Sequence, residues 1–137
     1  MIVVDTNIIA HAWLPSDLKD KIKLLIQLDN EWIAPILWRS EFRSVLSKLI
    51  RKDMISENKA IEISEEAESQ MISREFNVPT KNVISIVKRS TLSSYDSEFV
   101  ALAKFQDLKF ITLDKKIIKE FPQIAIHLED FIKENSV

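Results

Sequence analysis

Two short apolar runs in the sequence end in an aspartate. The first is IVVD, which ends at Asp5, and the second is FITLD, which ends at Asp114. In an open parallel sheet the carboxyl ends of the strands line one crevice. Two strands with these sequences would therefore turn both carboxylates into the same cavity, where they could hold a metal ion or move a proton.

Two further acids lie where they could join this pair. Asp96 falls in the first turn of a predicted helix after a serine-rich loop, and Glu41 lies beside the apolar stripe of another helix. Four carboxylates brought together repel one another and cannot all ionise in a dry pocket. Divalent cations resolve this conflict, and oxygen ligands without His or Cys select Mg²⁺ or Mn²⁺. Such ions bind a phosphodiester and activate water, so that no side-chain nucleophile is needed.

The composition limits the remaining classes. A chain of 137 residues with 46% hydrophobic content fits one domain, residues 1–137. The net charge of −2 argues against a basic nucleic-acid-coating surface but not against a nucleic-acid enzyme. The absence of cysteine excludes disulfides and thiolate zinc sites, and the absence of glycine excludes Gly-rich phosphate loops. No signal peptide or membrane span is visible, so we expect a cytoplasmic protein without a membrane partner.

Strands and helices alternate along the chain. The pattern predicts an α/β fold with a mostly parallel sheet of four or five strands. The expected strands cover residues 2–5, 31–34, 110–113 and 124–128. The expected helices cover residues 7–14, 17–28, 35–51 with Pro35 in the first turn, 56–76 with Ser56 as N-cap, a segment from 79 onward, one capped by Ser94, 115–120 and 130–135. The polar region 53–91 shows no motif.

The ordered set of these motifs resembles a known family. It comprises VVDTN at 3–7, the helix with Glu41, SSYDSEFVALA at 93–103 and FITLD at 110–114. In this order they are similar to PIN-domain ribonucleases, and most closely to the VapC-type toxins of toxin–antitoxin pairs. The resemblance covers nearly the whole chain and implies a three-layer α/β/α fold around the central, mostly parallel sheet.

The resemblance also implies a site, a cofactor and partners. The family's acidic residues match Asp5, Glu41, Asp96 and Asp114, the first, third and fourth as ligands of Mg²⁺ or Mn²⁺. They would cut RNA with metal-activated water and leave a 5′-phosphate. Homodimers are usual in the family, and the C-terminal segment of an antitoxin protein blocks the site. The polar residues that match the family are Thr6, Asn7 and Thr112. Ser94, which has no nearby base and is expected to cap a helix, is a further supporting residue because it could help to hold substrate or a metal-bound water.

Several basic side chains lie close to these acids in the sequence. Arg39 and Arg43 flank Glu41, and Lys115 and Lys116 follow Asp114. Side chains of this kind contact phosphate groups in nucleic-acid enzymes. The simpler interpretation of the same residues is a solvated helix face.

Other interpretations remain open at this level. Each acid alone has a structural explanation as a turn former, a helix cap or a charge that complements a helix dipole. A PIN fold could bind RNA or a protein without cutting, or process RNA as a housekeeping nuclease. An aspartyl-phosphate hydrolase expects a second Asp where Asn7 stands, and a receiver-like phosphotransfer domain expects an adjacent acidic pair that IVVDTN lacks.

Overall fold

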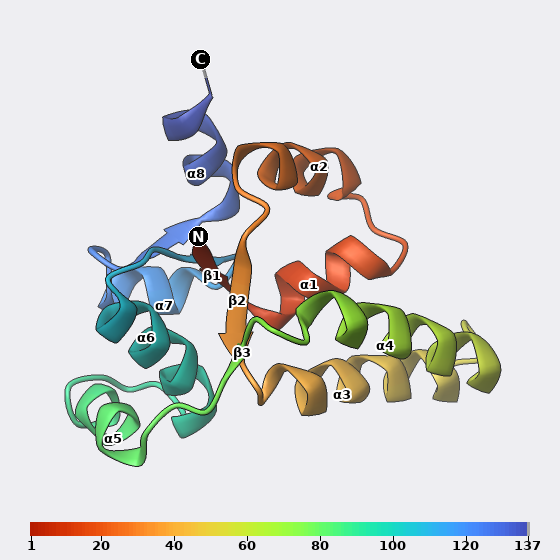
Figure 1. Cartoon of the computed structure of the whole chain (residues 1–137), viewed down its shortest axis with the longest axis horizontal. Coiled ribbons are helices and arrows are strands. Elements are labelled where there is room, and N and C mark those ends of the chain that lie inside the picture. The colour runs from red at the N-terminus through yellow and green to blue at the C-terminus, as the bar shows by residue number, and fades with distance from the viewer. Residues whose placement is uncertain (137) are drawn as a thin grey trace.

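A five-stranded parallel sheet forms the centre of the molecule (Figure 1). The computed structural model describes residues 1–136. The strand order is β3-β2-β1-β4-β5, and every neighbouring pair is parallel. The strands are β1 (Ile2–Val4), β2 (Trp32–Pro35), β3 (Glu75–Phe76), β4 (Phe110–Thr112) and β5 (Ala125–His127).

Helices cover both faces of this sheet, which confirms the predicted three-layer α/β/α fold. The helices are α1 (Thr6–Trp13), α2 (Lys19–Leu28), α3 (Trp38–Arg51), α4 (Glu57–Met71), α5 (Thr80–Lys88), α6 (Ser94–Gln106), α7 (Lys115–Glu120) and α8 (Leu128–Asn135). Helix α6 packs on β1, β2 and β4, and α5 packs against α6 (Figure 1). Helix α1 contacts β4, and α2 packs against α1 and α8. Helices α3 and α4 run side by side away from the sheet. Within residues 1–136 no helix is long and apolar enough to span a membrane.

The core explains why the strand-ending acids are held firmly. All three residues of β1 are buried, as expected for a central strand covered on both faces. Phe99 of α6 stacks on Phe110 of β4, with the ring centroids 5.7 Å apart. Because β1 and β4 are neighbours in register, the residues that follow them emerge together at one edge of the sheet.

Three local predictions were wrong. Pro35 does not begin a helix but ends β2, where its missing N–H costs nothing because the ladder to β3 uses the N–H groups of Ala34 and Ile36. The helix predicted to reach Phe76 ends at Met71, and the chain then forms the short edge strand β3. The N-cap of α6 is Ser93 and not Ser94, since the Ser93 hydroxyl accepts from the backbone N–H of Asp96.

Glu75 holds β3 and the start of α3 together. It accepts hydrogen bonds from Trp38 Nε1 at 2.7 Å and, through both oxygens, from Arg39 at 2.6 and 2.7 Å. Arg39 also donates to Glu68 of α4 at 2.8 Å. Burial would raise the pKa of Glu75, but the bonds from Arg39 and Trp38 outweigh it and lower that pKa. The side chain of Glu75, only 7% exposed, therefore joins β3 to α3 as a carboxylate, and Arg39 extends the contact to α4.

Replacing Glu75 with Ala should lower the free energy of unfolding by about 2–4 kcal/mol, because it leaves Arg39 and the buried Trp38 N–H without their acceptor. The matched control is Glu62→Ala, which removes an exposed ion pair to Lys59 within α4 and should cost less than about 0.5 kcal/mol. Urea unfolding monitored by circular dichroism measures both. Equal, small losses in the two variants would contradict the role given to Glu75.

Candidate active site

The Thr112 hydroxyl links the acids that follow two neighbouring strands. Asp5 lies between β1 and α1, where its Oδ1 accepts from the backbone N–H of Thr6 at 2.8 Å. Its Oδ2 accepts a hydrogen bond from Thr112 Oγ1 at 2.7 Å. The same hydroxyl oxygen accepts from the backbone N–H of Asp114 at 3.0 Å. Since Thr112 is fully buried, this arrangement fixes the Asp5 carboxylate and the backbone of Asp114 relative to each other.

A second buried hydroxyl brings in Glu41 from α3. Thr6 Oγ1 donates to Glu41 Oε1 at 2.7 Å, and Thr6 is 4% exposed. Glu41 lies in the first turn of α3, which packs against α1, and is half-buried. A series of hydrogen bonds thus connects three of the four predicted acids. It runs from Asp114 through Thr112, Asp5 and Thr6 to Glu41.

Asp96 enters the site from α6. Ser93 holds the first turn of this helix, because its Oγ accepts from the backbone N–H of Asp96 at 3.1 Å and its carbonyl accepts from Ser97 Oγ at 2.7 Å. Asp96 is half-buried, whereas Asp114 is exposed at the start of α7. The Asp114 carboxylate also caps α7 by accepting from the Lys116 N–H at 2.9 Å. A capping role and a place in the site are therefore compatible.

The charges of the four acids act on one another. Burial raises the pKa of Asp5 to about 6, and the negative charges of Glu41 and Asp96 add to this effect against the hydrogen bond from Thr112. Burial and the charge of Asp96 also raise the pKa of Glu41. Burial and the charge of Asp114 raise the pKa of Asp96. The acids from four elements consequently form one electrostatic cluster, hereafter the carboxylate cluster: Asp5, Glu41, Asp96 and Asp114.

The other predicted site residues differ in their exposure to solvent and in whether they already form ion pairs. Asn7 and Ser94 are exposed in the first turns of α1 and α6, next in sequence to the cluster. Lys115 is exposed on α7. The Arg39 guanidinium is already occupied by Glu75 and Glu68, which argues against Arg39 as a phosphate contact. Arg43 keeps a side chain 61% exposed, 3.5 Å from Glu68, and is the freer of the two arginines.

Two further residues lie beside the cluster: Glu98, which sequence reasoning missed, and Lys116, which it named together with Lys115. Glu98 of α6 is half-buried, and its pKa is raised by burial and by the charge of Glu41. Lys116 is exposed on α7, and its charge opposes the rise in the pKa of Asp96. Glu98 stands two residues after Asp96 in the motif YDSEF, and this spacing was the available signal. The signal for Lys116, as for Lys115, was its place directly after Asp114 in the sequence.

The donor chemistry of the cluster fits a hard divalent ion. All four side chains offer carboxylate oxygens, the ligands preferred by Mg²⁺ and Mn²⁺. The negative charges of the four acids repel one another, and a bound cation would neutralise them. Among the described residues, no three His, Cys, Asp or Glu side chains are grouped closely enough to hold one ion together. Mg²⁺ commonly binds through one or two carboxylates and keeps several waters. This spacing is therefore compatible with the ion.

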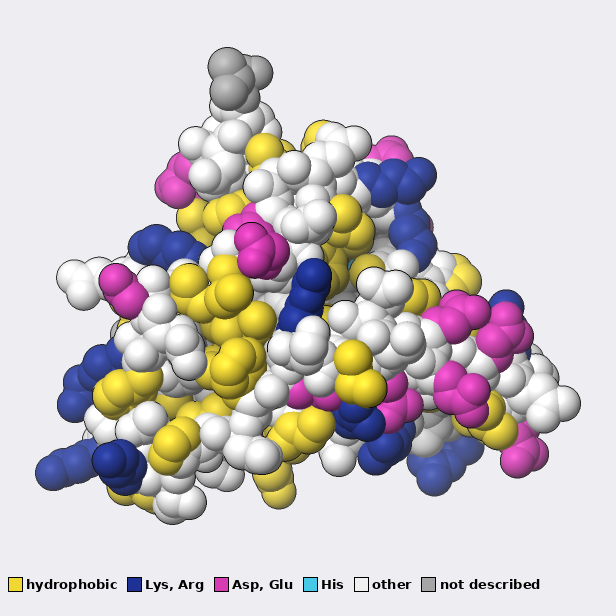
Figure 2. Space-filling view, viewed as in Figure 1, with side chains coloured by type: hydrophobic (Ala, Val, Ile, Leu, Met, Phe, Trp, Pro, Cys, Tyr) yellow, Lys and Arg dark blue, Asp and Glu magenta, His cyan; other side chains and the backbone are white. Residues whose placement is uncertain are grey.

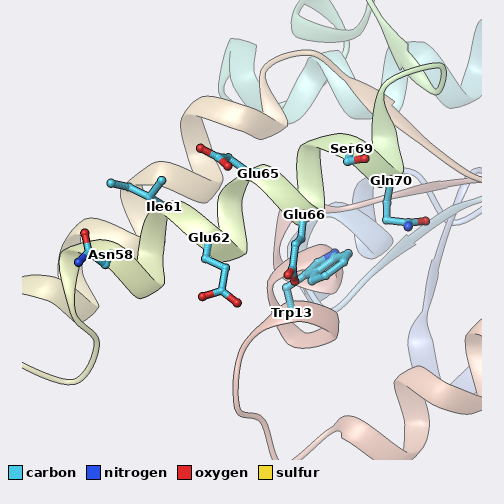
Figure 3. Close-up of a pocket in the computed structure, with 8 residues that line it drawn as sticks. All are labelled: Trp13, Asn58, Ile61, Glu62, Glu65, Glu66, Ser69 and Gln70. Atoms are coloured by element: carbon cyan, nitrogen blue, oxygen red, sulfur yellow. The ribbon is translucent and has the colours of Figure 1, made fainter.

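A separate acidic cavity lies on the outer face of α4 (Figure 3). It has a volume of about 660 Å³, and Trp13, at the end of α1 away from Asp5, forms part of its wall. Glu62 and Glu66 point toward the Trp13 side, and Figure 2 shows acidic side chains gathered over this helix with basic ones below them. Such a surface repels phosphate groups, so we assign it no part in RNA binding.

Comparisons with known proteins agree with this architecture. Residues 2–124 match the family model described as PIN domain. The fold is similar to the crystal structure of PAE2754 from Pyrobaculum aerophilum, with a TM-score of 0.76, 16% identity, and coverage of 98% of this chain and 96% of that chain. It is also similar to the crystal structure of FitAcB from Neisseria gonorrhoeae, with a TM-score of 0.73, 15% identity, and coverage of 94% and 99%. At these identities the likeness shows the fold alone. No curated protein matches the sequence.

From the raised pKa of Asp5 we predict how the free energy of unfolding depends on pH. Because the folded state raises this pKa from 3.8 to about 6, it binds the proton more tightly than the unfolded chain does. Stability should fall as the pH rises from about 4 to 6 and stay low above that range. Asp5→Asn should then raise the free energy of unfolding by about 1–3 kcal/mol at pH 8 in EDTA, and by much less at pH 4.

Urea unfolding at both pH values measures this difference. Asp20→Asn, which neutralises an exposed carboxylate on α2, is the control and should change stability little at either pH. An Asp5→Asn protein that is destabilised equally at pH 4 and pH 8 would contradict the electrostatic strain assigned to the cluster.

Proposed function

Because the chain belongs to the PIN-domain family, whose members are generally nucleases, we propose that it is a metal-dependent endoribonuclease acting at the carboxylate cluster. One observation carries the proposal. Two buried threonine hydroxyls hold acids from separate elements at the carboxyl edge of the sheet, within range of each other's charge. A fold seldom keeps such repulsion unless a ligand relieves it. Residues 1–137 would act as one domain.

The four acids have different roles in hydrolysis. Asp5, Asp96 and Asp114 would hold Mg²⁺ or Mn²⁺, with one or two of them as direct ligands and the others through water. When bound, the ion lowers the pKa of a water and neutralises charge that develops on the phosphodiester. Oε1 of Glu41 is held by Thr6, which leaves Oε2 to accept a proton from the attacking water. A bond from the water oxygen to phosphorus forms and the bond from phosphorus to O3′ breaks, and O3′ takes a proton from solvent, so that one product carries a 5′-phosphate and the other a 3′-hydroxyl.

Other side chains support the site without taking part in bond changes. Thr6 and Thr112 orient the carboxylates through the hydrogen bonds described above. Arg43, Lys115 and Lys116 are exposed cations that contact flanking phosphates. Asn7 and Ser94 are the exposed polar groups nearest the acids in sequence, and they would orient the substrate or the attacking water.

A groove next to the site supports the toxin role within the family. It has a volume of about 430 Å³, begins at Asn7 and runs along α1, α3 and the start of α4. Its walls are mainly apolar, including Ala10, Leu14, Val45, Leu49, Met54 and Ile55. We infer that an antitoxin segment lies here and covers the site of a cytoplasmic homodimer. Co-purification with the product of a short upstream reading frame would support this role, and its absence would favour housekeeping RNA processing.

A non-catalytic module that binds RNA or a protein is the second candidate. The observation in its favour is that, within residues 1–136, no three acids are grouped to surround one ion. Such a module needs no metal, and substitutions of the acids should leave its binding of RNA or protein unchanged. The nuclease requires both the metal and the acids, so one experiment separates the two candidates.

Replacing Asp96 with Asn should reduce RNA cleavage on the order of 100-fold or more, because it removes a metal ligand while keeping the shape of the side chain. Cleavage is measured on gels with structured and unstructured RNAs in Mg²⁺, in Mn²⁺ and in EDTA. The wild-type protein should cut only in the presence of a divalent ion.

The control is the same substitution at the opposite end of the same helix. Asp107 is the left-handed C-cap of α6, a conformation that Asn adopts readily, so Asp107→Asn should keep full activity. Undiminished cleavage by a folded, repurified Asp96→Asn protein would exclude the proposed mechanism. Cleavage by neither the wild type nor the control, in any metal, would favour the binding module.

A further inference from the structure

The single tyrosine of the chain lies exposed beside the carboxylate cluster. Tyr95 directly precedes Asp96 and is 60% exposed. Phe99 on the same helix, by contrast, is 1% exposed and stacks on Phe110 in the core. The aromatic ring of Tyr95 therefore contributes little to the core, and unlike Phe105, which is also exposed on this helix, it lies next to a candidate metal ligand.

Helix geometry places Tyr95 at the rim of the site. Successive residues of a helix are about 100° apart around its axis, so Asp96 lies about 100° to one side of Tyr95 and Glu98 about 60° to the other. Both flanking carboxylates lie near enough to Glu41 for their charges to interact. In the first turn a side chain also leans toward the helix start, which here is the edge that carries the cluster. The Ser93 cap fixes this turn through the Asp96 N–H.

The charge of the site explains what such a ring would bind. The cluster and Glu98 repel phosphate groups, and the chain has a net charge of −2, so a general basic surface cannot supply the affinity for RNA. Contacts to the bases add to the affinity that local cations such as Lys116 supply. An exposed aromatic face offers base stacking, which tolerates any sequence and is worth more per base than most exposed contacts.

We propose that Tyr95 is a stacking platform for one nucleobase of single-stranded RNA, next to the phosphate that lies at the carboxylate cluster. The inference rests on the proposed function, since it takes RNA as the ligand of the cluster. It assigns Tyr95 to substrate positioning: the ring holds a neighbouring base and thereby sets which phosphate reaches the acids. Lys116, on the Asp96 side of the site, holds the phosphate backbone as the strand leaves.

The test uses the fact that the chain has one tyrosine. Labelling with 3-fluorotyrosine gives a protein with a single ¹⁹F resonance, which reports on the Tyr95 ring alone. Fluorescein-labelled 12-nucleotide homopolymers of adenylate, uridylate and cytidylate are added in Ca²⁺, which takes the same oxygen ligands in looser geometry. Anisotropy measures binding, and the ¹⁹F spectrum measures whether a base stacks on the ring.

Three variants distinguish the contribution of the aromatic face to RNA binding from the contributions of side-chain size and of the hydroxyl group. Tyr95→Phe should bind within about 2-fold of the wild type, while Tyr95→Leu and Tyr95→Ala should bind about 5- to 100-fold more weakly. The ¹⁹F resonance should shift on saturation, most with adenylate because a purine offers the larger face. In Mg²⁺ or Mn²⁺, the Leu and Ala variants should raise KM for cleavage more than they lower kcat.

The outcomes distinguish this inference from the proposed function. Saturation by RNA with an unmoved resonance, or wild-type affinity in Tyr95→Leu, overturns the stacking platform and leaves the nuclease standing. A shifted resonance without cleavage in any metal supports the platform and overturns the nuclease. No binding of any homopolymer overturns the platform, and the cleavage assay with structured RNAs then decides the nuclease by itself. A resonance that changes with protein concentration alone, with equal RNA binding by all variants, assigns the ring to a contact between copies and overturns the platform.

Discussion

The hydrogen bond from the buried Thr112 hydroxyl to Asp5 is the contact on which the rest of the site depends. It ties β4 to the end of β1, while the same oxygen accepts from the backbone of Asp114. A parallel sheet supplies the position, since its carboxyl edge is where the chain leaves the core. The hydroxyl then fixes the direction of the carboxylate, and Thr6 does the same for Glu41. Without these two threonines the acids could turn toward water and relieve their repulsion.

This arrangement carries a stability cost that other parts of the molecule offset. The raised pKa of Asp5 means that its ionised form is disfavoured in the folded state. A core that includes the full burial of Val3, Val4 and Phe110 holds the two strands in place. The Glu75 interactions with Trp38 and Arg39 secure the start of α3, the helix that carries Glu41. Electrostatic strain at the site is thus held by apolar packing and by a well-paired carboxylate elsewhere.

The central sheet and the acids could be predicted from sequence because their signals are local. The β-branched run before Asp5 is typical of a buried strand, and FITLD repeats the pattern before Asp114. The α7 boundaries, 115–120, were predicted as found for the same reason, since Asp114 precedes and Pro122 follows them. The site assignment itself stays a prediction until the acids are replaced.

Two of the three misses share a physical cause, which is that long-range contacts decided the outcome. Strand β3 has two residues and no periodicity, and it forms because Ala34 and Ile36 of the β2 segment donate to it and because Glu75 finds Trp38 and Arg39. The pairing of Arg39 with Glu75 spans 36 positions, so the sequence showed only an arginine near Glu41. The choice between Ser93 and Ser94 as N-cap is a one-residue shift that adjacent serines do not resolve.

Proton release on Mn²⁺ binding tests the central claim most directly, because an ion that relieves the repulsion must displace the proton that Asp5 holds near pH 6. Calorimetric titration in buffers of different ionisation enthalpy counts the protons released. We predict roughly half a proton per ion from Asp5 at pH 6, close to none at pH 8, and loss of the pH 6 release in Asp5→Asn. Binding without proton release at pH 6, or no binding by the folded protein at either pH, would contradict the account.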